Sequence, residues 1–345
     1  YNTFKNNVDY IRSENNKNNS YTLGMNQFGD LTQHEFKTQV VGGCFMGSAA
    51  YAAPTAPNGR APSPVDWVAK GHVQKVKNQG QCGSCWAFAA ISALESAASI
   101  AGKGLVDLSE QQLVDCAGAE GNQGCNGGLM NQAYDYLIKF GGSQPTSSYP
   151  YTARDGACKA DKSKVAVQFC GTIALLPLLG AYLLTVCWQF AASHQELAAN
   201  ENALGDALQK GPVSVAIEAD QSIFQFYTSG VLDGNAAATL TTVSPLLASA
   251  LLVDWLLDVR LASHVPTRSS LLVFANCSVK NSWGTTWGNK GYVWIRAMKN
   301  MCGITGNGWN SVRCTVDTRL VAYSLCSCLA CFVAPLPFVA QQPAI

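Results

Sequence analysis

The chain has 345 residues, a net charge of +1 and 13% charged residues, about half of the usual ~25%. No basic run is longer than a pair of residues, so we expect no nucleic-acid partner. Fourteen cysteines are many for a reducing compartment and predict disulfide bonds. The protein is therefore expected on the secretory route, in a lysosome or vacuole or outside the cell. The sequence starts at Tyr1 without a charged-then-apolar leader, so we expect that any signal peptide has been removed or was never recorded.

Residues 1–60 are expected to form a segment of their own. Four of its residues recur at spacings of three and four, which predicts one face of an amphipathic helix: Phe4, Asn7, Ile11 and Asn15. A second motif, G-M-N-Q-F-G-D, follows at 24–30. Residues 47–64 are rich in Ala, Pro and Gly, which predicts an exposed connector that a protease could cut.

The most specific motif of the chain is C-G-S-C-W, at residues 82–86. An apolar, helix-forming run follows from Trp86 to about Gly102, so we expect Cys85 at the start of a helix. The free amides and the positive dipole end at that position favour a thiolate, which is the nucleophilic form of cysteine. A lone cysteine beside a tryptophan is more often a packing residue, but here five consecutive positions match a catalytic motif.

This motif is a signature of papain-type cysteine proteases, and the chain resembles the cathepsin L-like branch of that family. The resemblance covers residues 4–40, 62–168, 200–235 and 279–304. It implies an α+β fold in which a helical lobe and a β-barrel-like lobe meet at an active-site cleft. The two motifs within residues 1–60 resemble the inhibitory propeptide, with its start truncated and Asp30 in a salt-bridge network.

The resemblance implies that the chain is a cysteine endopeptidase that is made as a zymogen. Its partners would be peptide or protein substrates and its own propeptide, which acts as an inhibitor. No cofactor and no metal site are expected, because the Cys-x-x-Cys of Cys82 and Cys85 would be used by a disulfide and a nucleophile.

Two further helices are predicted in the helical lobe. Ser109 followed by Gln112 is a capping-box signal for a helix over 109–116, and a helix over 129–140 should end at Gly141. The resemblance implies two disulfides here, although four cysteines alone allow three pairings. The implied pairs are Cys82 with Cys125 and Cys116 with Cys158.

Thiol-based amide hydrolysis needs a nucleophile, a base, a group that orients the base, and an oxyanion hole. The resemblance assigns Cys85 as the nucleophile and the side-chain amide of Gln79 as an oxyanion donor. It assigns Asn281 as the residue that orients the histidine, and Trp283 as the ring that shields their hydrogen bond. His264, 17 positions before Asn281, is the candidate base, but it lacks the D-H-G or N-H-A context of the family and an accidental histidine is the alternative.

The same resemblance places substrate-binding residues. The paired Gly127 and Gly128 would let the backbone of a substrate approach closely and bind as an added strand. Three further residues, Leu129, Met130 and Ala216, would line the main side-chain pocket. Trp283 is also counted among the substrate-binding residues. Apolar lining implies a preference for a hydrophobic residue two positions before the cut.

The resemblance is interrupted at about 169–195 and 236–277, where the chain is apolar and lacks the family motifs. We interpret both stretches as insertions of the kind that unspliced introns produce. In agreement, Asn281 lies 196 positions after Cys85, roughly 45 more than the spacing typical of the family. The cysteine expected before the histidine is missing, so Cys302 lacks its usual partner, and Cys277 is a candidate substitute.

The resulting division is a propeptide and connector at 1–60, a helical lobe at 61–170, a β lobe at 171–316 and an apolar tail at 317–345. Two alternatives to an active protease stay open. One is a catalytically dead, peptide-binding homologue, because the histidine context is missing. The other is a membrane-tethered protein that uses the apolar segments, although a membrane is not expected because a span at 169–192 would separate two halves of one fold.

Overall fold

The computed structural model describes residues 1–41, 63–168, 191–198, 200–233, 247–261, 271–297 and 311–317. Its helices are α1 (Asn2–Asn15), α2 (Gln33–Phe36), α3 (Cys85–Ala98), α4 (Glu110–Cys116), α5 (Met130–Phe140), α6 (Glu201–Leu208) and α7 (Ser222–Gln225). Short helical turns are η1 (Lys37–Val41), η2 (Ser99–Lys103), η3 (Ala117–Glu120), η4 (Gly124–Asn126) and η5 (Lys162–Lys164). The strands are β1 (Tyr21–Leu23), β2 (Val65–Asp66), β3 (Gly142–Ser143), β4 (Val167–Gln168), β5 (Ala191–Glu196), β6 (Val213–Glu218), β7 (Tyr227–Leu232), β8 (Leu247–Leu261), β9 (Leu271–Lys280), β10 (Tyr292–Arg296) and β11 (Ser311–Asp317).

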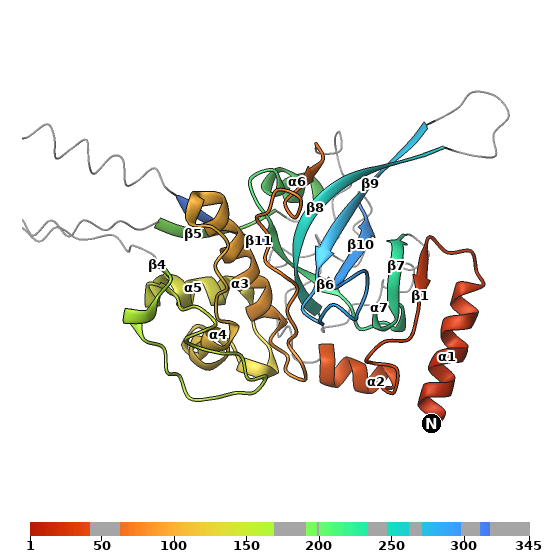
Figure 1. Ribbon diagram of the computed structural model, residues 1–345, viewed down its shortest axis with the longest axis horizontal. Coiled ribbons are helices and arrows are strands. Elements are labelled where there is room, and N and C mark those ends of the chain that lie inside the picture. The colour runs from red at the N-terminus through yellow and green to blue at the C-terminus, as the bar shows by residue number, and fades with distance from the viewer. Residues whose placement is uncertain are drawn as a thin grey trace, which may run out of the picture.

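A helical lobe forms around α3, which lies between the helices α4 and α5 on one side and the sheet on the other (Figure 1). The helix is apolar on nearly all sides and is accordingly buried on nearly all sides. The side chain of Ser109 caps α4 by accepting a hydrogen bond from the Gln112 N–H, and α5 ends at Gly141 with φ 98°. The three helices predicted for this lobe are therefore present, with boundaries within a few residues of those predicted.

Among the described residues, one helical segment, Cys85–Lys103, is long and apolar enough to cross a membrane by length and composition. Most of that segment is buried inside the protein. It is the central helix of the helical lobe, and its apolar character is explained by packing.

The second lobe is built on a nine-stranded sheet with the order β1-β7-β10-β9-β8-β6-β11-β5, and β2 pairs with β8 off this path. β7 and β10 are parallel, and the other described pairs are antiparallel. The two longest strands, β8 and β9, form the centre with Leu252 opposite Val279. Because β9 leads directly into Asn281, this central pair positions one of the predicted site residues.

The stretch expected to be an insertion contributes to that centre. Residues 247–261 form β8 and residues 271–277 form most of β9. Residues 191–195, in the other expected insertion, belong to the edge strand β5. A strand that carries the N-S-W-G segment needs hydrogen-bonding neighbours, and β8 supplies them whatever the origin of its sequence. That origin and the domain boundaries stay predictions.

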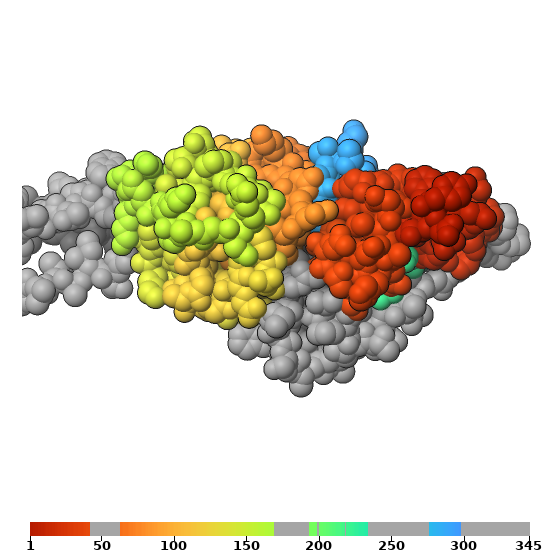
Figure 2. Space-filling model, turned by 90° about the horizontal axis from the view of Figure 1, so that it is seen from below, coloured from red at the N-terminus to blue at the C-terminus, as the bar shows by residue number. Residues whose placement is uncertain are grey.

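Residues 1–41 form a separate arm that packs on the β lobe (Figures 1 and 2). β1 adds to the sheet beside β7, with Tyr21 opposite Gly230. The predicted face of α1, which carries Asn7 and Ile11, is turned toward the protein. The Asn7 amide donates to the carbonyls of Gly29 and Leu31, each at 2.9 Å, and Ile11 is buried.

Two expectations for this arm differ from the structure. Phe4, expected on the same face as Ile11, is 48% exposed near the free end of α1. Asp30 is exposed and has no ion pair within the described residues, so the salt-bridge network expected for it is not formed there.

Candidate active site

The segment that connects the two lobes ahead of α3 is the nucleophile loop, defined here as residues 79–85. Cys85 is the first residue of α3 and is fully buried. The backbone carbonyl of Ser84 accepts the first helical hydrogen bonds, from Ala87 N–H at 2.9 Å and Phe88 N–H at 3.2 Å. Cys85 is disulfide-bonded, and its partner sulfur lies outside the described residues. The sulfur can act as a nucleophile only after that bond is reduced.

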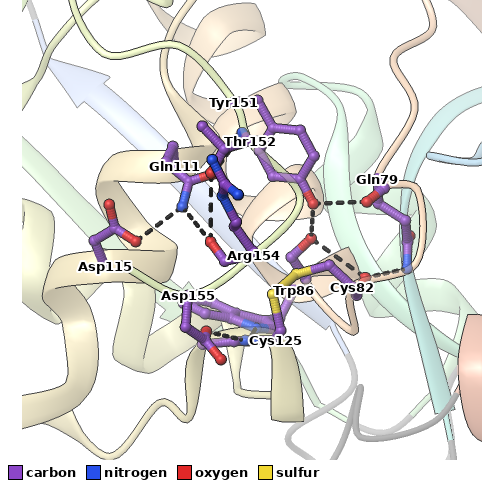
Figure 3. The surroundings of a disulfide bond; sticks show 12 residues. Gln79, Cys82, Trp86, Gln111, Asp115, Cys125, Tyr151, Thr152, Arg154 and Asp155 are labelled. Carbon is purple, nitrogen blue, oxygen red and sulfur yellow. Dashed lines mark hydrogen bonds between the residues drawn. A yellow bond between two sulfur atoms is a disulfide. The ribbon is translucent and has the colours of Figure 1, made fainter. Parts of the chain in front are cut away.

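A second disulfide pins the nucleophile loop to the glycine-rich turn that follows α4 (Figure 3). Cys82 and Cys125 are joined, and the Gly83 N–H donates to the Cys125 carbonyl at 2.9 Å. The Trp86 indole donates to the Gly124 carbonyl at 3.1 Å. The structure also joins Cys116 to Cys158. These are the two pairings that the family resemblance implies.

Gln79 is fully buried between the loop, the β lobe and the N-terminal arm. Its side-chain NH₂ donates to the carbonyl of Val40 at 3.2 Å and to the carbonyl of Cys82 at 3.0 Å. Its side-chain oxygen accepts from the Ser282 hydroxyl at 2.6 Å. Because backbone carbonyls only accept hydrogen bonds, the contacts with Val40 and Cys82 fix which end of the amide carries the NH₂. The amide therefore points its N–H groups at a peptide carbonyl of the arm.

Asn281 follows β9 and is 2% exposed. Its side-chain oxygen accepts from the Ser282 N–H at 2.7 Å, and its buried side-chain nitrogen has no hydrogen-bond partner among the described residues. An unpaired buried amide costs about 1–3 kcal/mol, so such a group normally has a reason to be kept. The described residues supply no imidazole for this amide, so the orienting role of Asn281 stays a prediction.

Trp283 lies under the N-terminal arm. The ring meets Phe28 and Phe36 of the arm edge-on, with centroids 5.7 and 5.3 Å away, and it also packs against Trp287. The Trp283 carbonyl accepts from the side chain of Gln27 at 2.7 Å. The residue predicted to shield the catalytic hydrogen bond is thus a docking platform for the arm.

Three of the four histidines are described, and each lies elsewhere. His34 is on α2, His72 is hydrogen-bonded to Ser99 at 3.0 Å, and His194 stacks on Tyr134. Two strands lie beside the end of β9, namely β8 with Leu251 opposite Lys280 and β10 with Tyr292 opposite it, and neither contains a histidine. His264, the candidate base, lies outside the described residues.

The predicted substrate-binding residues fall into two groups. Gly127 and Gly128 are buried in the turn held by the Cys82–Cys125 disulfide, and Gly127 has φ 115°. A Cβ on Gly128 would lie 2.2 Å from the Asn122 side-chain oxygen, so this turn requires glycine.

The apolar group is divided between surface and core. Met130 and Ala216 are buried in one hydrophobic cluster with α3, whereas Leu129 is half-buried. The structure brings Met130 and Ala216 to the junction of the two lobes. Whether these side chains line a substrate pocket stays a prediction.

Cys277, the candidate substitute partner for Cys302, is a free and buried thiol. That pairing is therefore absent. Burial raises the pKa of the Cys277 thiol well above its ordinary value, so the group stays protonated and unreactive. Within the described residues, no group of three His, Cys, Asp or Glu side chains could hold a metal ion.

Sequence reasoning missed a buried charge network beneath the nucleophile loop. Lys77, two residues before Gln79, contacts Glu95 at 2.9 Å, Asp107 at 2.8 Å and Glu110 at 2.7 Å. Lys280, the residue before Asn281, is buried nearby, and burial lowers its pKa to about 8. One signal for the network exists in the sequence, since Glu95 is the one charged residue of an otherwise apolar helix.

Comparison with known proteins settles the family. Residues 61–177 and 185–311 match the description "Papain family cysteine protease", and residues 1–36 match the cathepsin propeptide inhibitor domain. The chain belongs to the papain family of cysteine proteases. Like papain-family proenzymes, it carries its propeptide, which is the N-terminal arm of residues 1–41 described above.

Individual relatives agree with this assignment. Cysteine proteinase 2 of Dictyostelium discoideum is 36% identical over 337 residues, which cover 88% of this chain and 83% of that protein. Thiol protease aleurain of Arabidopsis thaliana is 40% identical over 307 residues, which cover 88% of this chain and 75% of that protein.

Solved structures of proenzymes are similar as well. Procathepsin L 3 from the larval midgut of Tenebrio molitor has a TM-score of 0.68 and 30% identity, covering 91% of this chain and 90% of that one. The proform of the ragweed pollen protease Amb a 11 has a TM-score of 0.69 and 31% identity, covering 92% and 88%. The papain-like fold with its propeptide is therefore the fold of this chain.

Proposed function

We propose that this papain-family proenzyme is a cysteine endopeptidase that uses Cys85 as its nucleophile and prefers a hydrophobic residue two positions before the cut. The observation that carries the proposal is the contact between the Gln79 amide and the Val40 carbonyl. A peptide carbonyl beside the start of α3 is the group that an oxyanion hole must bind. In this proposal, the propeptide occupies the Gln79 donor with one of its own carbonyls, which supports its role as the inhibitor.

The reaction that we propose has two steps. The Cys85 thiolate attacks the scissile carbonyl carbon, and the Gln79 NH₂ and the Cys85 backbone N–H stabilise the oxyanion. The carbon–nitrogen bond then breaks as a histidine, for which His264 is the candidate, gives its proton to the leaving amine. Water hydrolyses the thioester and restores the thiol. Asn281 would orient the histidine by accepting its ring N–H.

The residues expected at the substrate retain their roles in this proposal. Gly127 and Gly128 would pair with the backbone of the substrate. Leu129, Met130 and Ala216 would form the apolar side-chain pocket, and peptide or protein chains would be the substrates. The domain division at 60, 170 and 316 is proposed with it.

A secretory-route location, in a lysosome or vacuole or outside the cell, is proposed on the disulfides. The Cys82–Cys125 and Cys116–Cys158 bonds need an oxidising compartment to form. One relative, from Arabidopsis thaliana, is named a KDEL-tailed cysteine endopeptidase, and that tail is a retention signal of the secretory route.

A catalytically dead, peptide-binding homologue is the second candidate. It is favoured by Asn281, whose buried side-chain nitrogen has no partner in the part of the chain that the structure describes, while its oxygen is occupied by the Ser282 N–H. In that case, the cleft would still bind peptide, but the thiol would lack a base.

Active-site titration separates the two candidates. The full chain is reduced, acidified and treated with a peptidyl epoxide, and labelling of Cys85 is followed by mass. An active enzyme is labelled rapidly and stoichiometrically, only after reduction, and His264→Ala loses on the order of a thousandfold or more in rate. His72→Ala, whose ring contacts Ser99 away from Cys85, is the matched control and keeps the rate. Labelling no faster than that of a free thiol in all variants supports the dead homologue.

A further inference from the structure

The nucleophile loop is tied at both ends to one side chain outside it. The hydroxyl of Tyr151 donates to the backbone carbonyl of Gln79 at 2.7 Å. The same hydroxyl oxygen lies 2.6 Å from the hydroxyl of Ser84. Figure 3 shows the Tyr151 ring reaching down to the loop, with its hydroxyl directed toward Gln79. One side chain therefore links the residue that carries the amide to the residue directly before Cys85.

The hydrogens of this link can be assigned. Tyr151 has one hydroxyl hydrogen, and it is directed to the Gln79 carbonyl, so the Ser84 hydroxyl must donate to the Tyr151 oxygen. The other acceptor within reach of Ser84, the Cys82 carbonyl, is 3.5 Å away and makes a weaker bond. The result is a directed chain from Ser84 through Tyr151 to Gln79, and such chains strengthen each member.

Gln79 is held by the loop from its other side too. Its side-chain NH₂ donates to the Cys82 carbonyl at 3.0 Å while its backbone carbonyl accepts from Tyr151. Together these bonds set both the position of the Gln79 backbone and the direction of its amide. Removing the Tyr151 hydroxyl would release the backbone of Gln79 and leave the Gln79 carbonyl without this donor.

Tyr151 is itself rigidly placed. The ring meets Phe88, one turn after Cys85, edge-on at 4.9 Å. The next residue, Thr152, donates its N–H to the Gln111 side chain at 2.8 Å, and Gln111 binds the Arg154 carbonyl at 2.8 Å (Figure 3). Burial raises the pKa of Tyr151 to about 12, so the hydroxyl remains a donor throughout the acidic and neutral range.

We infer that Tyr151 is a positioning residue for the reaction proposed above, because its hydroxyl fixes the Gln79 oxyanion donor relative to Cys85. The inference rests on the proposed function. The hydroxyl touches neither the sulfur nor the substrate, so its removal should weaken oxyanion stabilisation and leave thiolate reactivity and peptide binding unchanged. A ring that served only to pack would tolerate the loss of its hydroxyl.

The test uses Tyr151→Phe in the reduced, acidified full chain, with kcat and KM per titrated Cys85 for a peptide amide. We expect kcat to fall about tenfold or more, with KM and the rate of Cys85 alkylation by iodoacetamide within about twofold of the unsubstituted chain. Tyr149→Phe is the matched control. It belongs to the same Y-P-Y segment but donates to Asp115 at 2.8 Å, away from the nucleophile loop, and should leave all three values unchanged.

An unchanged kcat in Tyr151→Phe overturns the inference. A fall in alkylation that matches the fall in kcat also overturns it, because the residue would then act through the thiolate or the fold. If Tyr151→Phe does not fold, Ser84→Ala cuts the same chain at its other end and should lower kcat in the same selective way.

Failure of the proposed function is distinguishable from failure of this inference. If the unsubstituted chain shows no turnover, the affinity for a peptide aldehyde decides, since its hemithioacetal oxygen occupies the oxyanion site without bond cleavage. An affinity about tenfold weaker in Tyr151→Phe supports the positioning role. Equal affinities overturn it.

Discussion

At the scale of single residues, the carboxylates around Lys77 form a charge network that is largely buried. Glu95 and Glu110 are almost fully buried and share the Lys77 ammonium with Asp107. Burial raises the pKa of both glutamates, although the lysine opposes it, and the pKa of Glu110 reaches about 7. The network therefore takes up a proton on folding in mildly acidic solution.

A pH dependence of stability follows from Glu110. The folded chain holds this proton up to about pH 7, whereas the unfolded chain releases it near pH 4.3. The contribution of Glu110 to the free energy of unfolding therefore declines as pH rises from about 4.3 to about 7. In Glu110→Gln this decline should be smaller by on the order of 2 kcal/mol, as measured by denaturant unfolding at pH 5 and pH 7.

The control for this prediction is Asp9→Asn. Asp9 pairs with Arg12 at 4.0 Å and both side chains are more than half exposed, so its removal should leave the pH profile parallel to that of the unsubstituted chain. Parallel profiles for Glu110→Gln as well would show that Glu110 does not titrate in this range.

At the scale of elements, the propeptide is held by a few well-packed contacts. The strand β1 extends the sheet at β7, and α2 places Phe36 against Trp283. Phe36 is fully buried. Thr32, the N-cap of α2, forms a reciprocal capping box with Glu35. Lys37 then pairs with Asp220 at 2.7 Å. The short helix α2 is thus fixed to the β lobe, a few residues before Val40, whose carbonyl contacts Gln79.

Truncating Phe36 should release this part of the propeptide. Phe36→Ala removes a fully buried ring, which costs about 3 kcal/mol, or roughly a hundredfold in the population of the undocked arm. Tryptic cleavage within residues 1–41 of the unreduced full chain should accelerate by a similar factor, because cleavage follows that population when opening is rapid.

The exposed ring of the same arm provides the comparison. Phe4 is 48% exposed, so Phe4→Ala should be cleaved at the unsubstituted rate. Equal rates for Phe36→Ala and the unsubstituted chain would mean that α2 does not anchor the propeptide.

At the scale of the whole molecule, local patterns predicted the helical lobe well. The apolar run after Trp86, the Ser109 cap and the Gly141 stop each depend on neighbours in sequence, and each is present. Motif resemblance also led to the two disulfides and to the placement of Gln79 in the same loop as Cys85. Such features are encoded within short windows of sequence.

Long-range features were harder to predict. Residues 247–261 gave no strand signal or family motif, yet they lie at the centre of the sheet because β9 needs a partner there. The hydrogen bonds from Tyr151 to Gln79 and Ser84 join residues far apart in sequence, and no local pattern predicts them. The disulfide at Cys85 likewise depends on tertiary structure.

If Cys85 is the nucleophile that we propose, we expect the chain to be able to remove its own propeptide. The most direct measurement is the mass of the reduced full chain after acidification, compared with Cys85→Ala under the same conditions. We predict cleavage of the unsubstituted chain within residues 42–62, release of the arm and the appearance of peptide hydrolysis, while Cys85→Ala stays intact. An unsubstituted chain that stays intact, or equal cleavage of both chains, would contradict the account.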